Sequence, residues 1–95
     1  MQLRKIKVGK KCIQAILIKL SSKNLIILLG GKGYVMCGYL NLSVANKFKE
    51  VAVKITGVSS ITDSLCAKVH SATHAAKQLG IHKGQPIRDV LKIIA

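Results

Sequence analysis

The first half of the chain alternates between short apolar runs and polar or glycine-containing breaks, which is the pattern of strands joined by turns. The breaks fall at Gly9-Lys10, at residues 21–24 and at residues 30–33. Because these breaks are short, they favour an antiparallel meander. The expected strands are residues 1–8, 11–20, 25–29 and 34–39.

The second half begins with a short helix and one further strand. Residues 42–49 can form a helix, with Asn41 or Ser43 as its N-cap. Residues 51–56 then alternate apolar and polar side chains, as a strand does.

A long helix is expected from residue 60 to about residue 79. Ser60 followed by Asp63 resembles a capping box at its start, and Gly80 suits the C′ position at its end, with Ile81 as the apolar contact of that cap. The apolar positions of this segment recur at helical spacing along one face: Leu65, Val69, Ala72, Ala76 and Leu79.

The expected order is therefore four strands, a helix, a strand and two helices, the last helix running from Pro86 to residue 94. This order predicts one α+β domain over residues 1–95, with a largely antiparallel sheet of four to five strands and three helices on one face. Residues 11–20 and 25–29 are apolar on both faces, however, and helices on one side cover only one of them. We expect the sheet either to curl on itself or to meet a partner through its second face.

The charge is strongly unbalanced, since 16 Lys and Arg face three acids and the formal net charge is +13. Residues 1–49 contain no acid, so ion pairs within that half cannot neutralise it. An external polyanion could do so, namely RNA, DNA or an anionic membrane surface, and a solvated basic face is the alternative. The predicted phosphate contacts are the ten cations of this half: Arg4, Lys5, Lys7, Lys10, Lys11, Lys19, Lys23, Lys32, Lys47 and Lys49.

Aromatic side chains are few, which argues against base stacking and for recognition of phosphates and shape. The leading prediction is a non-enzymatic RNA-binding protein, a ribosome-associated structural protein that contacts rRNA phosphates. Its protein partners would be ribosomal proteins or a second copy, through the apolar sheet face. A protein-interaction module that oligomerises through the sheet is a further alternative.

The cysteines and apolar runs bear on location. Cys12, Cys37 and Cys66 are odd in number, widely spaced and without a C-x-x-C pair, which indicates a reducing cytoplasm. The longest apolar runs, residues 13–18 and 25–29, are far shorter than the roughly 20 residues of a membrane span. We expect a cytoplasmic protein with no membrane partner.

Catalytic and metal-binding patterns are weak. Cys66, His70 and His74 would lie at i, i+4 and i+8 of the expected long helix, but no fourth ligand is evident, so no metal site is expected. The three carboxylates are not paired for acid–base chemistry, and no cofactor is expected. The glycines of residues 30–33 fit no phosphate-binding loop pattern; a hairpin turn with positive φ explains them, and Lys32 at its tip could still touch a phosphate.

Cys37 ends a strand shortly before a helix. A thiol in that place can be activated by the helix N-terminus and by nearby cations, although a buried structural cysteine is the commoner case.

Two segments resemble the YunC-like family, an uncharacterised domain family of bacteria and archaea. They read GYVMCGYLN at residues 33–41 and GVSSITDSLCAKVHSATHAAKQLGIHKGQPIRDVL at residues 57–91. The resemblance covers roughly half of the chain and implies a small α/β or α+β domain, and the family has no established activity to carry over. It suggests an alternative function, a ligand-binding or enzyme-like protein with a site at Met36, Cys37, Gly38 and Asn41. Where the family tends to have Asp, this chain has Asn41.

Overall fold

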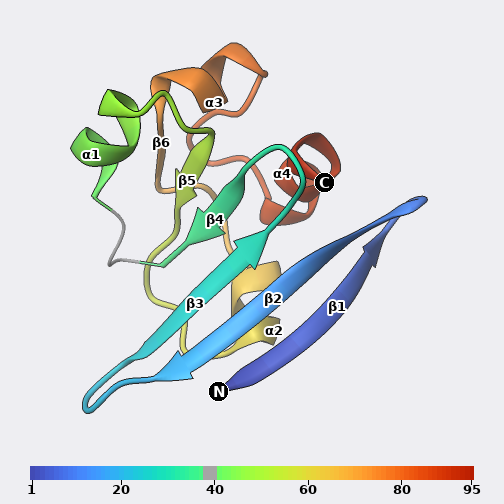
Figure 1. The fold of residues 1–95 in the computed structure, drawn as a ribbon, viewed down its shortest axis with the longest axis vertical. Coiled ribbons are helices and arrows are strands. Elements are labelled where there is room, and N and C mark those ends of the chain that lie inside the picture. The colour runs from blue at the N-terminus through green and yellow to red at the C-terminus, as the bar shows by residue number, and fades with distance from the viewer. Residues whose placement is uncertain (38–40) are drawn as a thin grey trace.

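The computed structural model describes residues 1–37 and 41–95, and in these residues the chain forms one six-stranded sheet and four helices (Figure 1). The strands are β1 (Gln2–Val8), β2 (Lys11–Lys19), β3 (Asn24–Leu29), β4 (Tyr34–Met36), β5 (Ala52–Lys54) and β6 (Ser71–Ala72). The helices are α1 (Leu42–Lys47), α2 (Ile61–Leu65), α3 (His74–Gln78) and α4 (Ile87–Ile94). None of the described helices is long and apolar enough to cross a membrane.

The sheet is mixed, and its strands follow one another in chain order from β1 to β6. Strands β1 to β4 form the expected antiparallel meander, whereas β4 and β5 pair in parallel and β5 and β6 pair antiparallel. The predicted α+β class is confirmed. The predicted numbers of four to five strands and three helices differ from the six and four that the described residues form.

The largest correction concerns the expected helix over residues 60–79. The chain forms α2, then leaves the helix, adds β6 to the sheet edge through Ala72 opposite Val53, and starts α3 after Thr73. Val69, Ala72 and Ala76 are buried as their spacing predicted, but from three different local structures. The segment is rich in Ser, Thr, Cys, Val and His, which are weak helix formers, so pairing with the sheet prevails.

The predicted caps are largely confirmed. Asn41 caps α1, its side chain accepting from the Val44 N–H, and the Ser60 hydroxyl accepts from the Asp63 N–H. At the end of α3 the N–H of Gly80 bonds the carbonyl of Lys77 and the N–H of Ile81 bonds that of Ala76, which is a Schellman motif.

The final helix starts one residue later than expected. Pro86 is its N-cap rather than its first helical residue, and α4 runs from Ile87. The four buried side chains of α4 are Ile87, Val90, Leu91 and Ile94.

The explanation of the glycines at residues 30–33 by positive φ is wrong. Among the residues that the structure describes, the glycines with positive φ are Gly9, Gly57, Gly80 and Gly84. Gly30 instead approaches the backbone carbonyl of Ile94 so closely that a Cβ atom would clash with it. The turn is therefore shaped by close packing on α4, and the Lys32 N–H bonds the Ile94 carbonyl at 2.7 Å.

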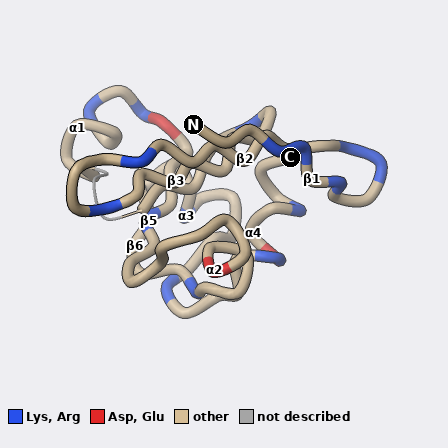
Figure 2. The backbone as a smooth tube through the Cα atoms, turned by 90° about the horizontal axis from the view of Figure 1, so that it is seen from below, with Lys and Arg blue, Asp and Glu red and all other residues tan. Residues whose placement is uncertain are grey.

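The two faces of the sheet differ in what covers them. One face carries the main core together with α2 and α4, as seen from below in Figure 2, and its fully buried side chains include Ile13, Ile26, Leu28 and Val35. Helix α1 lies on the other face, where Ala45 packs on Ala52 with Tyr34, Met36 and Leu42 around them. The part of that face over β1–β3 has no described element across it.

Candidate functional site

The β1–β2 hairpin projects beyond the rest of the sheet (Figure 1). Residues 11–13 of β2 pair with β1, but the pairing of β2 with β3 begins only at Gln14. Lys10 and Lys11 form the tip of this hairpin next to Gly9, whose φ of 62° allows the tight turn. The tip is therefore a cationic, exposed projection.

A groove of about 380 Å³ lies between this hairpin and α4. Apolar side chains supply its floor, and cations from both ends of the chain flank it. The groove is lined by Ile6, Lys7, Val8, Gly9, Leu65, Arg88, Leu91 and Lys92. Arg88, Leu91 and Lys92 have i, i+3 and i+4 spacing, so they share one face of α4.

Arg88 and Lys92 were not among the predicted contacts. They lie more than 75 residues away in sequence from the hairpin residues of the groove, and only the fold brings the two segments together. Their i, i+4 spacing on a helix was the available signal, but it does not say what that face of the helix meets.

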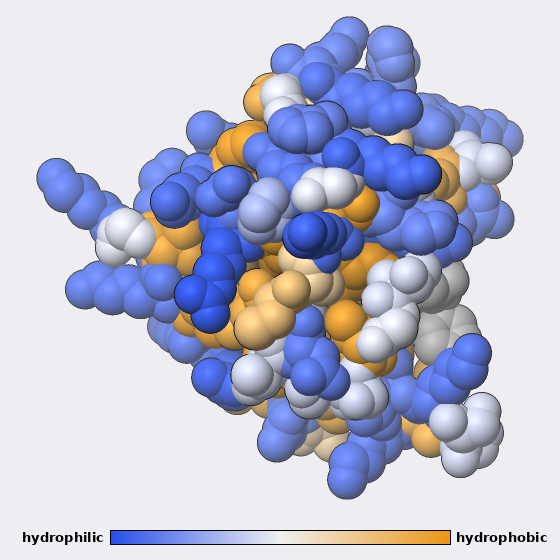
Figure 3. All heavy atoms as spheres, turned by 180° about the vertical axis from the view of Figure 1, so that it is seen from behind, coloured by the Kyte–Doolittle hydropathy of each residue, from blue (hydrophilic) through white to orange (hydrophobic). Residues whose placement is uncertain are grey.

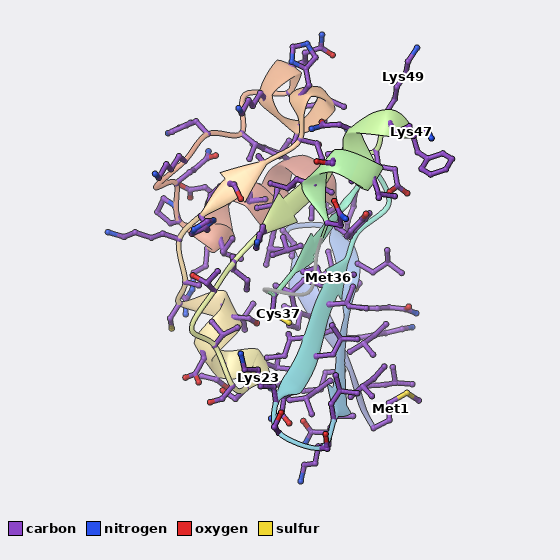
Figure 4. All side chains as sticks on the ribbon, turned by 90° about the vertical axis from the view of Figure 1, so that its left-hand side faces the viewer. Met1, Lys23, Met36, Cys37, Lys47 and Lys49 are labelled. Atoms are coloured by element: carbon purple, nitrogen blue, oxygen red, sulfur yellow. The ribbon has the colours of Figure 1, made fainter. Side chains whose placement is uncertain are left out.

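The ten predicted cations do not form one patch (Figure 2). Lys5, Lys7, Lys10 and Lys11 belong to the hairpin, whereas Lys19 and Lys23 lie at the opposite end of β2, next to the β2–β3 turn. Of the others, Arg4 is in β1, Lys32 is in the β3–β4 turn, and Lys47 and Lys49 are at the end of α1. Figure 4 shows Lys47 and Lys49 on the far side of the sheet from Lys23 and Cys37.

Two of the three acids bond to neutral groups. The Asp63 carboxylate accepts from the hydroxyl and the N–H of Ser59, at 3.0 and 3.3 Å, and the hydroxyl bond is the main cause that holds the pKa of Asp63 below its ordinary value. Glu50 accepts from the Tyr34 hydroxyl at 2.9 Å. Burial of the Tyr34 ring, followed by this bond and the charge of Glu50, raises the Tyr34 pKa to about 12.

Cys37 lines a separate pocket of about 470 Å³ on the helix-covered side of the sheet, the side on which Figure 4 also shows Lys23. Besides Cys37, the wall consists of Ser22, Lys23, Asn24, Thr56, Gly57, Val58 and Ser59. The thiol is 4% exposed; it accepts from the Ile26 N–H at 3.4 Å and donates to the Asn24 carbonyl at 3.7 Å. Cys37 is thus both a core residue and a lining residue of this pocket.

Of the four residues predicted for a ligand site, the three that the structure describes do not come together. Met36 packs in the small cluster beneath α1, on the opposite face from Cys37. Asn41 uses its side chain as the N-cap of α1. Gly38 lies outside the described residues. Among the described members of this set, Cys37 alone lines the pocket.

The residues weighed as metal ligands are dispersed because the expected long helix does not form. Cys66 follows α2, His70 precedes β6, and His74 begins α3, where its N–H bonds the Asn46 side chain at 2.8 Å. Within residues 1–37 and 41–95, no group of three His, Cys, Asp or Glu side chains is placed to hold a metal ion.

Comparison with known proteins places this fold. The model of a domain of unknown function, DUF1805, matches residues 36–94. The uncharacterized protein YunC of Bacillus subtilis (strain 168) is 38% identical over 81 residues, which cover 81% of this chain and 80% of that protein. The crystal structure of TA1206, a protein of unknown function from Thermoplasma acidophilum, superposes with a TM-score of 0.95 at 37% identity, covering 99% of this chain and 92% of that one. This chain therefore belongs to the DUF1805 family of YunC-like proteins.

Proposed function

We propose that this protein is a non-enzymatic RNA-binding protein that contacts phosphates through the groove between the β1–β2 hairpin and α4. The observation that carries this proposal is the gathering of cations there. Lys7 of the hairpin and Arg88 and Lys92 of α4 line the groove, Lys10 and Lys11 lie at the hairpin tip beside Gly9, and residues 1–49 contain no acid. Each lysine or arginine that neutralises a phosphate releases counterions, which is the main source of affinity for nucleic acids.

The chemistry of the groove favours the nucleic acid backbone over its bases. The floor is aliphatic, formed by Ile6, Val8, Leu65 and Leu91, and has no aromatic ring on which a base could stack. Arg88 offers a planar fork of donors that suits a phosphate, whereas the lysines act as point charges. Binding through these groups depends on charge and shape, with little sequence preference.

The remaining cations suit a protein that is enclosed by RNA on several sides. Lys23, Lys47 and Lys49, which Figure 4 labels, and Lys32 of the β3–β4 turn are not groove residues and would contact RNA elsewhere. The helix side of the molecule presents mainly hydrophilic side chains around a limited apolar area (Figure 3). This arrangement supports a structural protein of a large cytoplasmic RNA assembly, the ribosome first.

The first test is sedimentation of the native protein from cell lysate through a sucrose gradient at low and at high salt. The proposal expects the protein to travel with a ribosomal subunit at low salt and to leave it at high salt, because counterion release makes such binding strongly salt-dependent. A protein that stays at the top of the gradient at low salt contradicts the ribosomal assignment.

The second test locates the contact. Lys10→Gln with Lys11→Gln should weaken binding of an oligouridylate of about ten nucleotides and reduce the slope of log K against log salt by about 1.4, which is about 0.7 for each lost contact to a single strand. The matched control is Lys77→Gln with Lys83→Gln, which removes the same charge from α3 and the loop after it. Equal effects of the two pairs would show that net charge, and not the hairpin, governs binding.

A second candidate function rests on the position of Cys37 in its pocket. A pocket with a thiol and Lys23 could bind a small polar ligand. Alkylation by iodoacetamide, followed residue by residue by mass spectrometry, distinguishes the two roles. Preferential labelling of the buried Cys37 over the exposed Cys12 and Cys66 would support a functional thiol, and no labelling in the folded protein would identify Cys37 as a core residue.

A further inference from the structure

We propose that the face of β1–β3 turned away from α2 and α4, the open face, docks against the same face of a second copy of this chain. The strand register places one row of apolar side chains across four strands, in the order Leu3, Ile16, Ile27 and Met36. Ile18 pairs with Leu25, and Leu29 pairs with Gln14, so Ile18, Leu25 and Leu29 lie on the same face as this row. This proposal concerns a different surface from the RNA contact, because the groove floor formed by Ile6 and Val8 lies on the opposite face of β1.

The open face is incompletely covered. Helix α1 packs over Ala52 and beside Tyr34 and Met36, at the β4–β5 end. Over β1–β3 no element that the structure describes replaces it, and Leu3 and Leu29 are 64% and 42% exposed. In Figure 4 the side chains of these strands project from the sheet with α1 at one end only.

The occupant must fit a stepped surface rather than a plane. Helix α1 rises from the same face, and a helix with its side chains is about 10–12 Å thick. A flat bilayer would meet α1 before it reached Ile16 or Ile27, whereas a folded partner can pack against both the floor and the step. Two sheets that pack face to face stand about 10 Å apart, so side chains from both faces fill the space between them.

The charges around the open face suit an interface between proteins. The apolar row itself is uncharged, and strand alternation places Lys5 and Lys7 on the same face as Leu3 but on β1, the edge strand, where a rim stays in contact with water. An apolar floor matches the same floor on a second copy, as a two-fold interface requires. Nucleic acid is the poorer occupant, since it would leave this aliphatic row without a suitable partner.

The available area indicates a weak dimer. Three strands about 4.8 Å apart and about seven residues long at 3.3 Å each give roughly 330 Å² in projection. A standard interface buries about 800 Å² per partner, so the floor needs the side of α1 and the rim to complete it. The net charge of +13 on each copy also opposes pairing.

Because of this repulsion, pairing of the two copies should depend on the salt concentration. Raising NaCl from about 0.1 M to about 1 M shortens the Debye length from about 10 Å to about 3 Å and screens the repulsion between copies. Pairing should therefore strengthen with salt, whereas RNA binding weakens with salt. The two proposals can fail separately in the same series of measurements.

The experiment is sedimentation velocity of the nuclease-treated protein over a range of concentrations at both salt levels. We expect a monomer–dimer equilibrium with more dimer at about 1 M NaCl. Leu3→Gln with Leu29→Gln should weaken the dimer by about tenfold or more, since two leucine side chains leave the interface without a change in charge. Leu79→Gln, at a similarly exposed leucine that follows α3, should leave the dimer unchanged.

Three results would overturn the proposal. The first is a monomer at every concentration and salt level. The second is a dimer that Leu3→Gln with Leu29→Gln does not weaken, provided that circular dichroism shows the variant folded. The third is co-sedimentation with phosphatidylglycerol vesicles that the same variant abolishes, which would identify the open face as a lipid-binding surface.

Discussion

Thr73 offers the sharpest test of how the C-terminal half is held to the sheet. Its side chain is fully buried and its hydroxyl makes three hydrogen bonds. It donates to the Glu50 carbonyl at 2.6 Å, and it accepts from the N–H of Ala52 at 3.1 Å and of Ala76 at 3.3 Å. One hydroxyl thus joins the end of the α1–β5 connection, the start of β5 and the N-terminus of α3.

Thr73→Val keeps the shape of the side chain and removes all three bonds. The lost N-cap bond to Ala76 costs about 1 kcal/mol. The Ala52 N–H, left unpaired in the interior, costs about 1–3 kcal/mol, and the Glu50 carbonyl is less affected because Glu50 is exposed and water can reach it. The expected loss in the free energy of unfolding is about 3 kcal/mol, the sum of these two costs.

Thr73→Ser is the matched control, because it keeps the hydroxyl and loses one methyl group, at a cost of about 1 kcal/mol. Urea unfolding followed by circular dichroism should rank the proteins as wild type, Ser, then Val, with similar m values. A Val variant at least as stable as the Ser variant would refute the reasoning, since it would mean that packing and not the shared hydroxyl holds this junction.

Two further predictions concern titration. In a Tyr39→Phe background, absorbance near 295 nm should show Tyr34 ionising with a pKa of about 12, and Glu50→Gln should lower that pKa toward 10.0. Because folding raises the pKa of Tyr34, the contribution of its protonated hydroxyl to the free energy of unfolding is present below pH 10.0 and is lost as the pH rises toward about 12. NMR titration should place the pKa of the Asp63 carboxyl below its ordinary 3.8, and Ser59→Ala should raise it. Because folding lowers this pKa, the contribution of the ionised Asp63 to the free energy of unfolding is present above pH 3.8 and is lost as the pH falls through the pKa of the folded protein. An unshifted Tyr34 in the first titration, or an Asp63 insensitive to Ser59→Ala in the second, would contradict the hydrogen bonds assigned to them.

The meander was predictable because its signals are local. Each strand has its own apolar run and each turn its own polar or glycine residues, so β1 to β4 could be placed without knowing the rest of the fold. The apolar character of residues 11–20 and 25–29 on both faces of the expected strands also indicated that one sheet face would lack full cover. The open face over β1–β3 is the part of the sheet that no described element covers.

The segment from residue 60 to residue 79 shows the limit of periodicity. Buried Val69, Ala72 and Ala76 satisfy helical spacing, yet Ala72 is buried by pairing with Val53, which lies 19 residues earlier. That pairing is non-local, so no short window of the sequence contains both partners. The same limit explains why the groove was missed, since Arg88 and Lys92 reach the hairpin only through the packing of α4 on the sheet.

The positions of the two proposed surfaces imply that they act together. The floor of the groove and the open face lie on opposite sides of the sheet, so a pair formed through the open faces leaves the floor of each groove, with Arg88 and Lys92, free. RNA bound in the grooves would neutralise part of the positive charge that opposes pairing, so it would strengthen pairing. Thermodynamic linkage then requires that pairing strengthens RNA binding by the same factor. Two grooves on one assembly further raise the apparent affinity for an RNA long enough to span them. Binding of long RNA should then be cooperative in protein concentration, and Leu3→Gln with Leu29→Gln should remove that cooperativity without changing the affinity for an oligouridylate of about ten nucleotides, which occupies a single groove.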